Sequence, residues 1–143
     1  MHLIQRHVHD GSARPASEQR VLCVERRQFL KRRWRGVAED GTEFGFDLED
    51  RLPDGAVVLR TEACDYIVRQ QPETVYVLRP GSAAQAALVG WRLGNLHLPV
   101  EIAGSAVRVL HDPAVPLLCE REGWPVTEEY VVFKPLRVVA HAS

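Results

Sequence analysis

The second half of the chain alternates between strand-like and helical hydrophobic patterns, and this alternation restricts the folds available to it. Four apolar segments are typical of buried strands: 74–78, 98–102, 106–110 and the segment formed by Val126 with 130–133. Two segments between them have helical character, 82–95 and 112–122. The resulting order, strand–helix–strand–strand–helix–strand, is that of a ferredoxin-like βαββαβ domain.

The two predicted helices carry recognisable start and stop signals. Ser82 is a candidate N-cap of the first, in which apolar residues recur at helical spacing up to the stop at Gly94-Asn95. These recurring residues are Ala84, Ala87, Leu88 and Trp91. In the second helix, Asp112 is the candidate N-cap, Pro113 the first helical residue, and Gly123 follows the end.

The first half has short strand patterns separated by turn residues, and no helical repeat. The predicted strands are 21–24, 44–48, 56–60 and 66–69. We therefore predict an α+β chain with a small all-β N-terminal domain at 1–72 and a ferredoxin-like domain at 73–143. Residues 70–74, which include Pro72, are the expected linker.

One hairpin can be assigned a register. If Asp40-Gly41 forms a two-residue type I′ turn, Val37 lies opposite Phe44 and Arg33 opposite Leu48. Trp34 would then face Asp47. A three-residue loop with a bulge would shift the pairing by one residue.

Composition excludes several classes of protein. The 143 residues carry a net charge of -1, which favours neither nucleic acid nor an acidic membrane as a partner. No stretch approaches the roughly 18 consecutive apolar residues of a membrane span. The three cysteines form no CxxC pair, so neither a disulfide framework nor a thiolate zinc site is expected. These features predict a reduced, cytoplasmic protein.

A basic segment, residues 26–35, contains five arginines, one lysine and the aromatic residues Phe29 and Trp34. Such a strand has the chemistry to bind single-stranded nucleic acid. However, the acidic segment 39–54 would fold back against it and neutralise its charge. A protein-docking surface is therefore the better interpretation, and we expect no nucleic-acid partner.

Enzyme motifs are missing from the sequence. It has no Gly-rich phosphate loop, no GxSxG elbow and no HExxH pair. Cys119 lies among apolar residues of the second predicted helix, which favours a buried, inert thiol over a nucleophile. We therefore expect that the chain is not an enzyme.

The histidines are the remaining candidates for chemistry. Imidazole suits nickel, copper and zinc, but one histidine cannot complete a metal site. A symmetric dimer presents each residue twice, so a single histidine per chain supplies two donors near the two-fold axis. His97 is the prime candidate, with His141 near the C-terminus as a further donor. The N-terminal His2, His7 and His9 would bind metal only adventitiously.

The segment from Trp91 to Ile102, in which Gly94-Asn95-Leu96-His97 leads into an apolar strand, resembles the hallmark of the UreE family of nickel metallochaperones. His111-Asp112 after the strand at 107–110 is similar to the family's next segment, and Phe133-Lys134-Pro135 is similar to its closing Phe-x-Pro. Looser similarities extend through the first half.

The resemblance implies a peptide-binding-like N-terminal domain and a metal-binding, dimerising C-terminal domain with a short tail. It implies that His97 from two chains of a homodimer holds one Ni(II), which is delivered to the GTPase UreG and the urease activation complex. His111 and Asp112 would form a peripheral site. That site would be poorer here, because Pro113 stands where some members have another histidine.

Zn(II) and Cu(II) are the expected competitors for the nickel site. The alternative to a nickel carrier is a protein–protein docking module without a metal role, in which the histidines are incidental. Stoichiometric uptake of nickel would separate the two interpretations.

Overall fold

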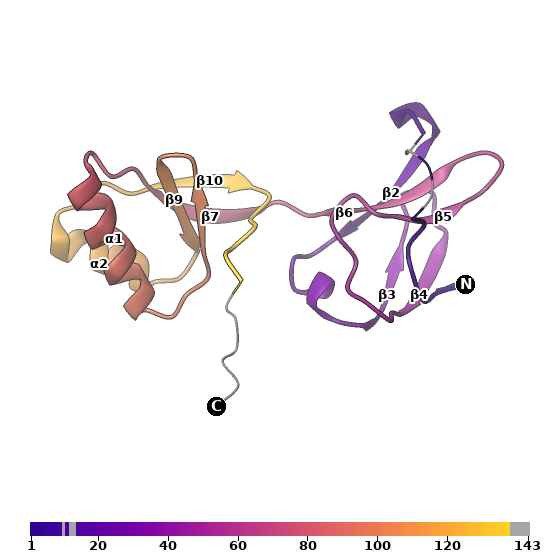
Figure 1. The fold of residues 1–143 in the computed structure, drawn as a ribbon, viewed down its shortest axis with the longest axis horizontal. Helices are drawn as coiled ribbons and strands as arrows, with labels where there is room; N and C mark the ends of the chain where they lie inside the picture. The colour runs from indigo at the N-terminus through magenta and orange to yellow at the C-terminus, as the bar shows by residue number, and fades with distance from the viewer. Residues whose placement is uncertain (10, 12–13, 138–143) are drawn as a thin grey trace. The chain divides into compact units, whose positions relative to one another are not determined.

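The computed structural model describes residues 1–9, 11 and 14–137 (Figure 1). The chain divides into two compact units, Met1–Gln71 and Pro72–Ser143. The expected linker at 70–74 is mostly strand, because one strand ends at Gln70 and the next begins at Glu73. The backbone N–H of Gln71 donates to the Val24 carbonyl at 2.7 Å, which ties this connection to the first unit.

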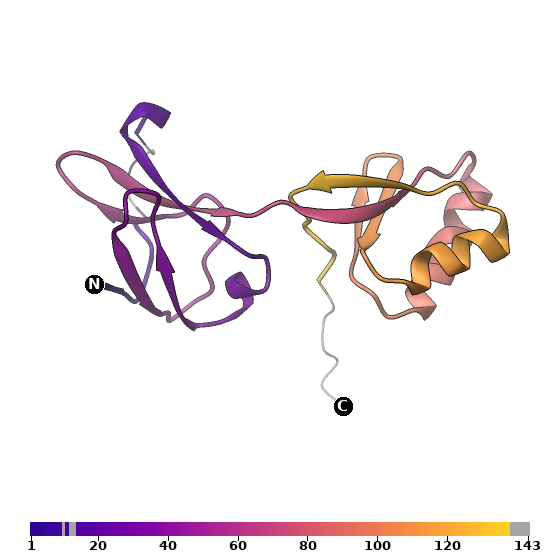
Figure 2. The same cartoon turned by 180° about the vertical axis from the view of Figure 1, so that it is seen from behind.

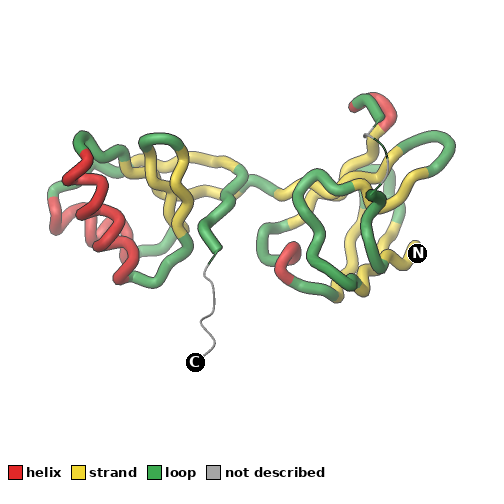
Figure 3. The backbone as a smooth tube through the Cα atoms, viewed as in Figure 1, coloured by secondary structure: helices red, strands yellow, loops and turns green. Residues whose placement is uncertain are grey.

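The first unit consists of two three-stranded sheets, in the orders β1-β4-β3 and β2-β6-β5. The small all-β N-terminal region predicted from the sequence is confirmed. Its strands are β1 (His2–Ile4), β2 (Gln19–Val24), β3 (Arg33–Val37), β4 (Glu43–Asp47), β5 (Val57–Arg60) and β6 (Asp65–Gln70). Two short 3-10 helices, Ala16–Glu18 and Gln28–Leu30, interrupt the connections (Figure 3).

The core of the first unit lies between the inward faces of its strands. Leu22, Phe44 and Val68 are almost completely buried. Trp34 stacks on Phe46 with 3.9 Å between the ring centroids. Burying a side chain of this size contributes about 1.5–3 kcal/mol, so these few residues account for much of the unit's stability.

The register predicted for the β3–β4 hairpin is wrong by one residue. Trp34 lies opposite Phe46, and Arg33 lies opposite Asp47. Gly41 has φ +86°, and the backbone N–H of Ala38 donates to the Thr42 carbonyl at 2.8 Å. A two-residue type I′ turn requires a positive φ at two positions, and in this loop only Gly41 has one. The loop therefore has three residues, with a bulge at Gly41.

The basic segment 26–35 is not a single strand. Of its cations, only Arg33 and Arg35 lie on β3. Phe29 packs against the core and Trp34 is buried within it, so neither ring is available for bases to stack on. Arg33 pairs with Asp47 at 3.1 Å, as expected of an acidic strand folded back on a basic one.

The second unit has the predicted βαββαβ order, with a four-stranded antiparallel sheet in the order β10-β7-β9-β8. This confirms the ferredoxin-like prediction. The elements are β7 (Glu73–Leu78), α1 (Ala83–Asn95), β8 (Val100–Ala103), β9 (Ala106–Leu110), α2 (Ala114–Glu122) and β10 (Thr127–Val131). The side chain of Ser82 caps α1, with 3.1 Å between its Oγ and the N–H of Gln85.

The two faces of this sheet are covered differently. Both helices pack on one face of the sheet (Figure 2). Leu78 of β7 is buried on this face against residues of both helices. Val75 and Val77 of the same strand point to the other face, where they contact the fully buried ring of Phe133. The segment after β10 therefore returns across this second face, and the backbone N–H of Leu136 donates to the Val100 carbonyl at 2.7 Å.

Candidate metal centre

His97 lies two residues beyond Asn95, the last residue of α1, and is exposed to solvent. Its φ is +56°, and it is the only residue other than glycine with a positive φ in the described part of the chain. Helices commonly end on a left-handed residue that is usually glycine, because a side chain in this conformation costs about 1–2 kcal/mol. Retaining an imidazole here, at a backbone cost, is typical of a functional position.

The outward face of α1 leads directly to His97. Val89 and Leu93 are the residues that the helix buries against the sheet, at 1% exposure each. The apolar repeat seen in the sequence, which includes Leu88 and Trp91, instead faces solvent, and Trp91 is 60% exposed. Sequence periodicity located the helix, but packing decided which apolar residues it buries.

The exposed residues of this outward face are uncharged, and the guanidinium carbon of Arg92 lies 4.8 Å from the centroid of the Trp91 ring. The face consists of Leu88 and Trp91 together with small or uncharged residues, namely Ala83, Ala84, Ala86, Ala87, Gly90, Gly94 and Asn95. Arg92, the only charged residue of α1, is half-buried and pairs with Glu122 at 3.1 Å. A Cβ at Gly90 or Gly94 would meet no other atom within 4 Å, so the helix backbone is bare there. Contiguous apolar surface of this kind marks interaction sites.

His111 and Asp112, the second pair of candidate ligands, each have another partner. The His111 ring stacks on Tyr76 with 4.4 Å between centroids, and its Nε2 lies 2.9 Å from a carboxylate oxygen of Glu128. Asp112 accepts the backbone N–H of Ala114 at 2.9 Å, which caps α2. The helix begins at Ala114, one residue after Pro113, which was the predicted first helical residue.

The partners of His111 were not evident from the sequence. Glu128 lies 17 residues away along the chain, and Tyr76 lies further away still. The antiparallel pairing of β10 with β7 places Glu128 opposite Tyr76, and β9 ends beside the same strand. No local signal predicts such a contact, since it depends on strand register.

His141 is outside the described residues. Within the described part of the chain, no three His, Cys, Asp or Glu side chains gather closely enough to hold a metal ion. His97 therefore has no described set of further donors within its own chain. Burial raises the pKa of the Cys119 thiol, which favours its protonated form. This agrees with the inert role expected for this residue.

The second unit is thus a ferredoxin-like domain with an exposed histidine after the end of its first helix. Residues 73–143 match the family profile described as the C-terminal domain of the UreE urease accessory protein.

The similarity extends beyond this domain. A urease accessory protein UreE from Beijerinckia indica is 32% identical over 123 residues, which cover 85% of this chain and 70% of that relative. A UreE from Alkalilimnicola ehrlichii is 30% identical over 125 residues, covering 86% and 76%. One from Sinorhizobium fredii is 29% identical over 136 residues, covering 93% and 84%.

The chain therefore belongs to the UreE family of urease accessory proteins, as the residues around His97 predicted. Among the described residues, no helix has both the length and the apolar character required to cross a membrane.

Proposed function

We propose that this protein is a nickel metallochaperone that binds Ni(II) in the cytoplasm and delivers it for assembly of the urease active site. The family membership supports a role in urease maturation. The observation that carries the nickel assignment is His97, which has a left-handed backbone and an exposed imidazole and follows the apolar outward face of α1.

The site is completed by a second copy of the chain. In an isologous dimer, the outward face of α1 packs against the same face of the partner copy, burying Leu88 and Trp91. The bare backbone at Gly90 and Gly94 permits close approach of the two helices. One His97 from each chain then supplies two neutral nitrogen donors to a shared ion near the two-fold axis.

Two imidazoles leave the remaining coordination positions to water or to His141 of either chain. Such an open site permits ligand exchange with an incoming protein, whereas a closed four-thiolate site does not. On this basis the urease accessory GTPase UreG and the urease activation complex are the proposed recipients. Zn(II) and Cu(II) compete, because imidazole binds all three metals.

His111 and Asp112 have a secondary role in this proposal. A metal ion at His111 would have to displace or share Glu128, and Asp112 would have to leave the cap of α2. We therefore assign to this pair, at most, weak peripheral binding.

Replacement of His97 tests the proposal, and two variants separate the loss of the imidazole from the strain of the backbone. His97→Ala removes the ligand but keeps a side chain at positive φ, whereas His97→Gly also removes the strain. We expect both variants to lose tight nickel binding in calorimetry while remaining folded dimers. His2→Ala, which removes an exposed histidine of the other unit, is the control and should bind one ion tightly per dimer.

A second variant tests the shared nature of the site. Trp91→Glu places a charge on the proposed interface, and we expect monomers by light scattering together with loss of tight nickel binding. Unchanged nickel affinity and stoichiometry in both His97 variants would overturn the metal assignment and favour the docking module. Tight binding by a monomeric Trp91→Glu protein would overturn the shared site.

A further inference from the structure

Two histidines of the first unit, which are not part of the proposed nickel site, have imidazole rings in contact. His7 and His9 flank Val8, and their ring centroids lie 4.0 Å apart with 44° between the ring planes. The contact therefore joins two side chains of one three-residue stretch of backbone.

The backbone that carries the pair is fastened at two points. The N–H of Val8 donates to the carbonyl of Val57, the first residue of β5, at 2.7 Å. The N–H of Glu49 donates to the Gln5 carbonyl at 3.0 Å, and the Arg6 side chain lies 3.4 Å from the Glu49 carboxylate. Ligands that are already held in place bind with a smaller loss of conformational entropy.

The two imidazoles are also available. In the described part of the chain, neither ring makes a hydrogen bond or an ion pair that would have to be broken. His9 is exposed and His7 half-buried. Burial, with a smaller contribution from the neighbouring His9, lowers the pKa of His7 below its usual value, which favours the neutral, ligating form.

We propose that His7 and His9 chelate a late first-row divalent cation, Cu(II) most strongly and Ni(II) or Zn(II) less so. Metal–nitrogen bonds of about 2 Å place each ring centroid about 3 Å from the ion, so rings on adjacent coordination positions lie about 4–5 Å apart. The observed 4.0 Å lies at the lower end of this range.

This site belongs to a single chain and does not depend on the proposed nickel function. No third His, Cys, Asp or Glu side chain joins the pair among the described residues, so water fills the other positions. It therefore binds more weakly than a site with three or four protein donors. It gives each chain a capacity for one exchangeable ion without a second copy.

The test uses the full chain in a His97→Ala background, which removes the proposed interface site. Calorimetric titration with Cu(II), and separately with Ni(II), should show one ion per chain. Adding His7→Ala and His9→Ala together should abolish this uptake. Either substitution alone should weaken it about a hundredfold, because the second donor of a linked pair binds at high effective concentration. His2→Ala in the same background is the matched control and should leave the uptake unchanged.

A spectroscopic measurement on the unmutated protein makes the test independent of any effect of substitution on folding. Zn(II) should shift the ring resonances of His7 and His9 in NMR spectra, while those of His2 remain in place. Equal uptake with and without the pair, or ring resonances unaffected by Zn(II), would overturn this proposal. Neither result would bear on whether His97 binds nickel.

Discussion

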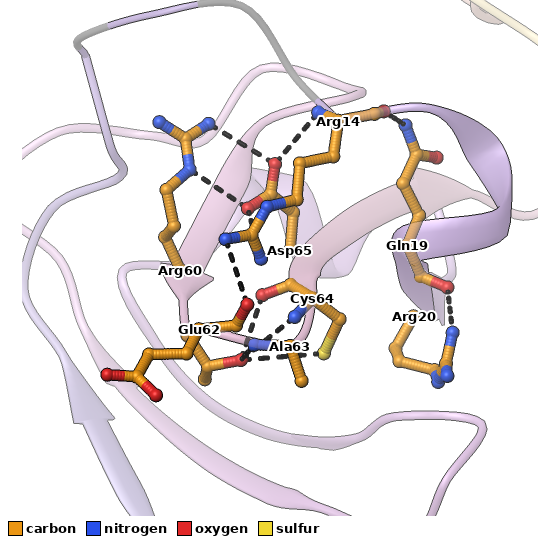
Figure 4. Close-up of polar contacts among 9 residues, drawn as sticks. Arg14, Gln19, Arg20, Arg60, Glu62, Ala63, Cys64 and Asp65 are labelled. Carbon is orange, nitrogen blue, oxygen red and sulfur yellow. Dashed lines mark hydrogen bonds and ion pairs between the residues drawn. The ribbon is translucent and has the colours of Figure 1, made fainter.

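Asp65 at the start of β6 gives the sharpest test of what stabilises the first unit. It is the only buried charged residue in the described part of the chain, and none of its side chain is exposed. Its carboxylate accepts two bonds from Arg60, at 2.9 and 3.2 Å, and the backbone N–H of Arg14 at 3.0 Å (Figure 4). It thereby ties the segment before β2 to β5 and β6.

We expect Asp65→Asn to destabilise the first unit by about 3 kcal/mol. Asparagine has one acceptor oxygen, and its N–H₂ group takes the place of the other. Arg60 then faces a donor where it had an acceptor, so its two charge-assisted hydrogen bonds, of about 1.5–3 kcal/mol each, are lost or weakened. The loss stays at the lower end of the range for a broken buried ion pair, because the Arg60 and Arg14 side chains are 30% and 27% exposed and can be hydrated.

Urea unfolding followed by the amide NMR signals of β5 and β6 measures this loss. Asp47→Asn is the matched control, since Asp47 pairs with Arg33 at 3.1 Å but both side chains are at least half exposed. Exposed pairs are worth about 0–1 kcal/mol, so this variant should lie within about 1 kcal/mol of the unmutated protein. Equal destabilisation by the two substitutions would refute the reasoning.

The pH dependence supplies a second criterion. The hydrogen bonds from Arg60, followed by the Arg14 N–H and the charges of both arginines, hold the pKa of Asp65 below its usual value despite its burial. The stability that the carboxylate contributes is therefore fully present above about pH 5, and it is lost as the pH falls through about 4 and below. The stability difference between the Asp65→Asn variant and the unmutated protein should shrink over that range. A difference that persists unchanged at pH 3 would contradict the mechanism.

Three further substitutions have expected outcomes that the same measurement can check. Phe133→Ala should cost the second unit about 3–5 kcal/mol, because it empties the fully buried position against Val75 and Val77; a loss under about 1 kcal/mol would contradict this packing. Gly41→Ala should destabilise the β3–β4 hairpin by about 1–2 kcal/mol, since alanine is strained at φ +86°, and no loss would mean that the bulge is absent. Ser82→Ala should lower the stability of α1 by about 1 kcal/mol, visible as faster amide exchange in its first turn.

Much of the fold could be predicted from the sequence, because the signals are local. Helical spacing and the cap at Ser82 identified α1, and the order of strands and helices identified the ferredoxin-like topology. Glycine, asparagine and histidine at the end of a helix, leading into an apolar strand, were enough to indicate the family. Each strand, helix and cap is signalled by residues that are close together in the sequence, and the topology follows from the order of these elements.

The hairpin register shows where local signals end. Asp40-Gly41 is compatible with loops of two or three residues, and the two choices differ by one residue in every pair. The observed three-residue loop places Trp34 against Phe46 in the core and leaves Arg33 beside Asp47 at the surface. Burial of the stacked rings favours this arrangement, and that burial exists only when the strands have packed together.

The candidate site divides in the same way. The sequence by itself marked His97, His111 and Asp112 as residues with ligand chemistry. Only the tertiary structure turned the apolar repeat of α1 toward solvent and placed His111 beside Glu128. The physical reason is that periodicity specifies which residues share a face of a helix or strand, whereas exposure and partners depend on what the other elements cover.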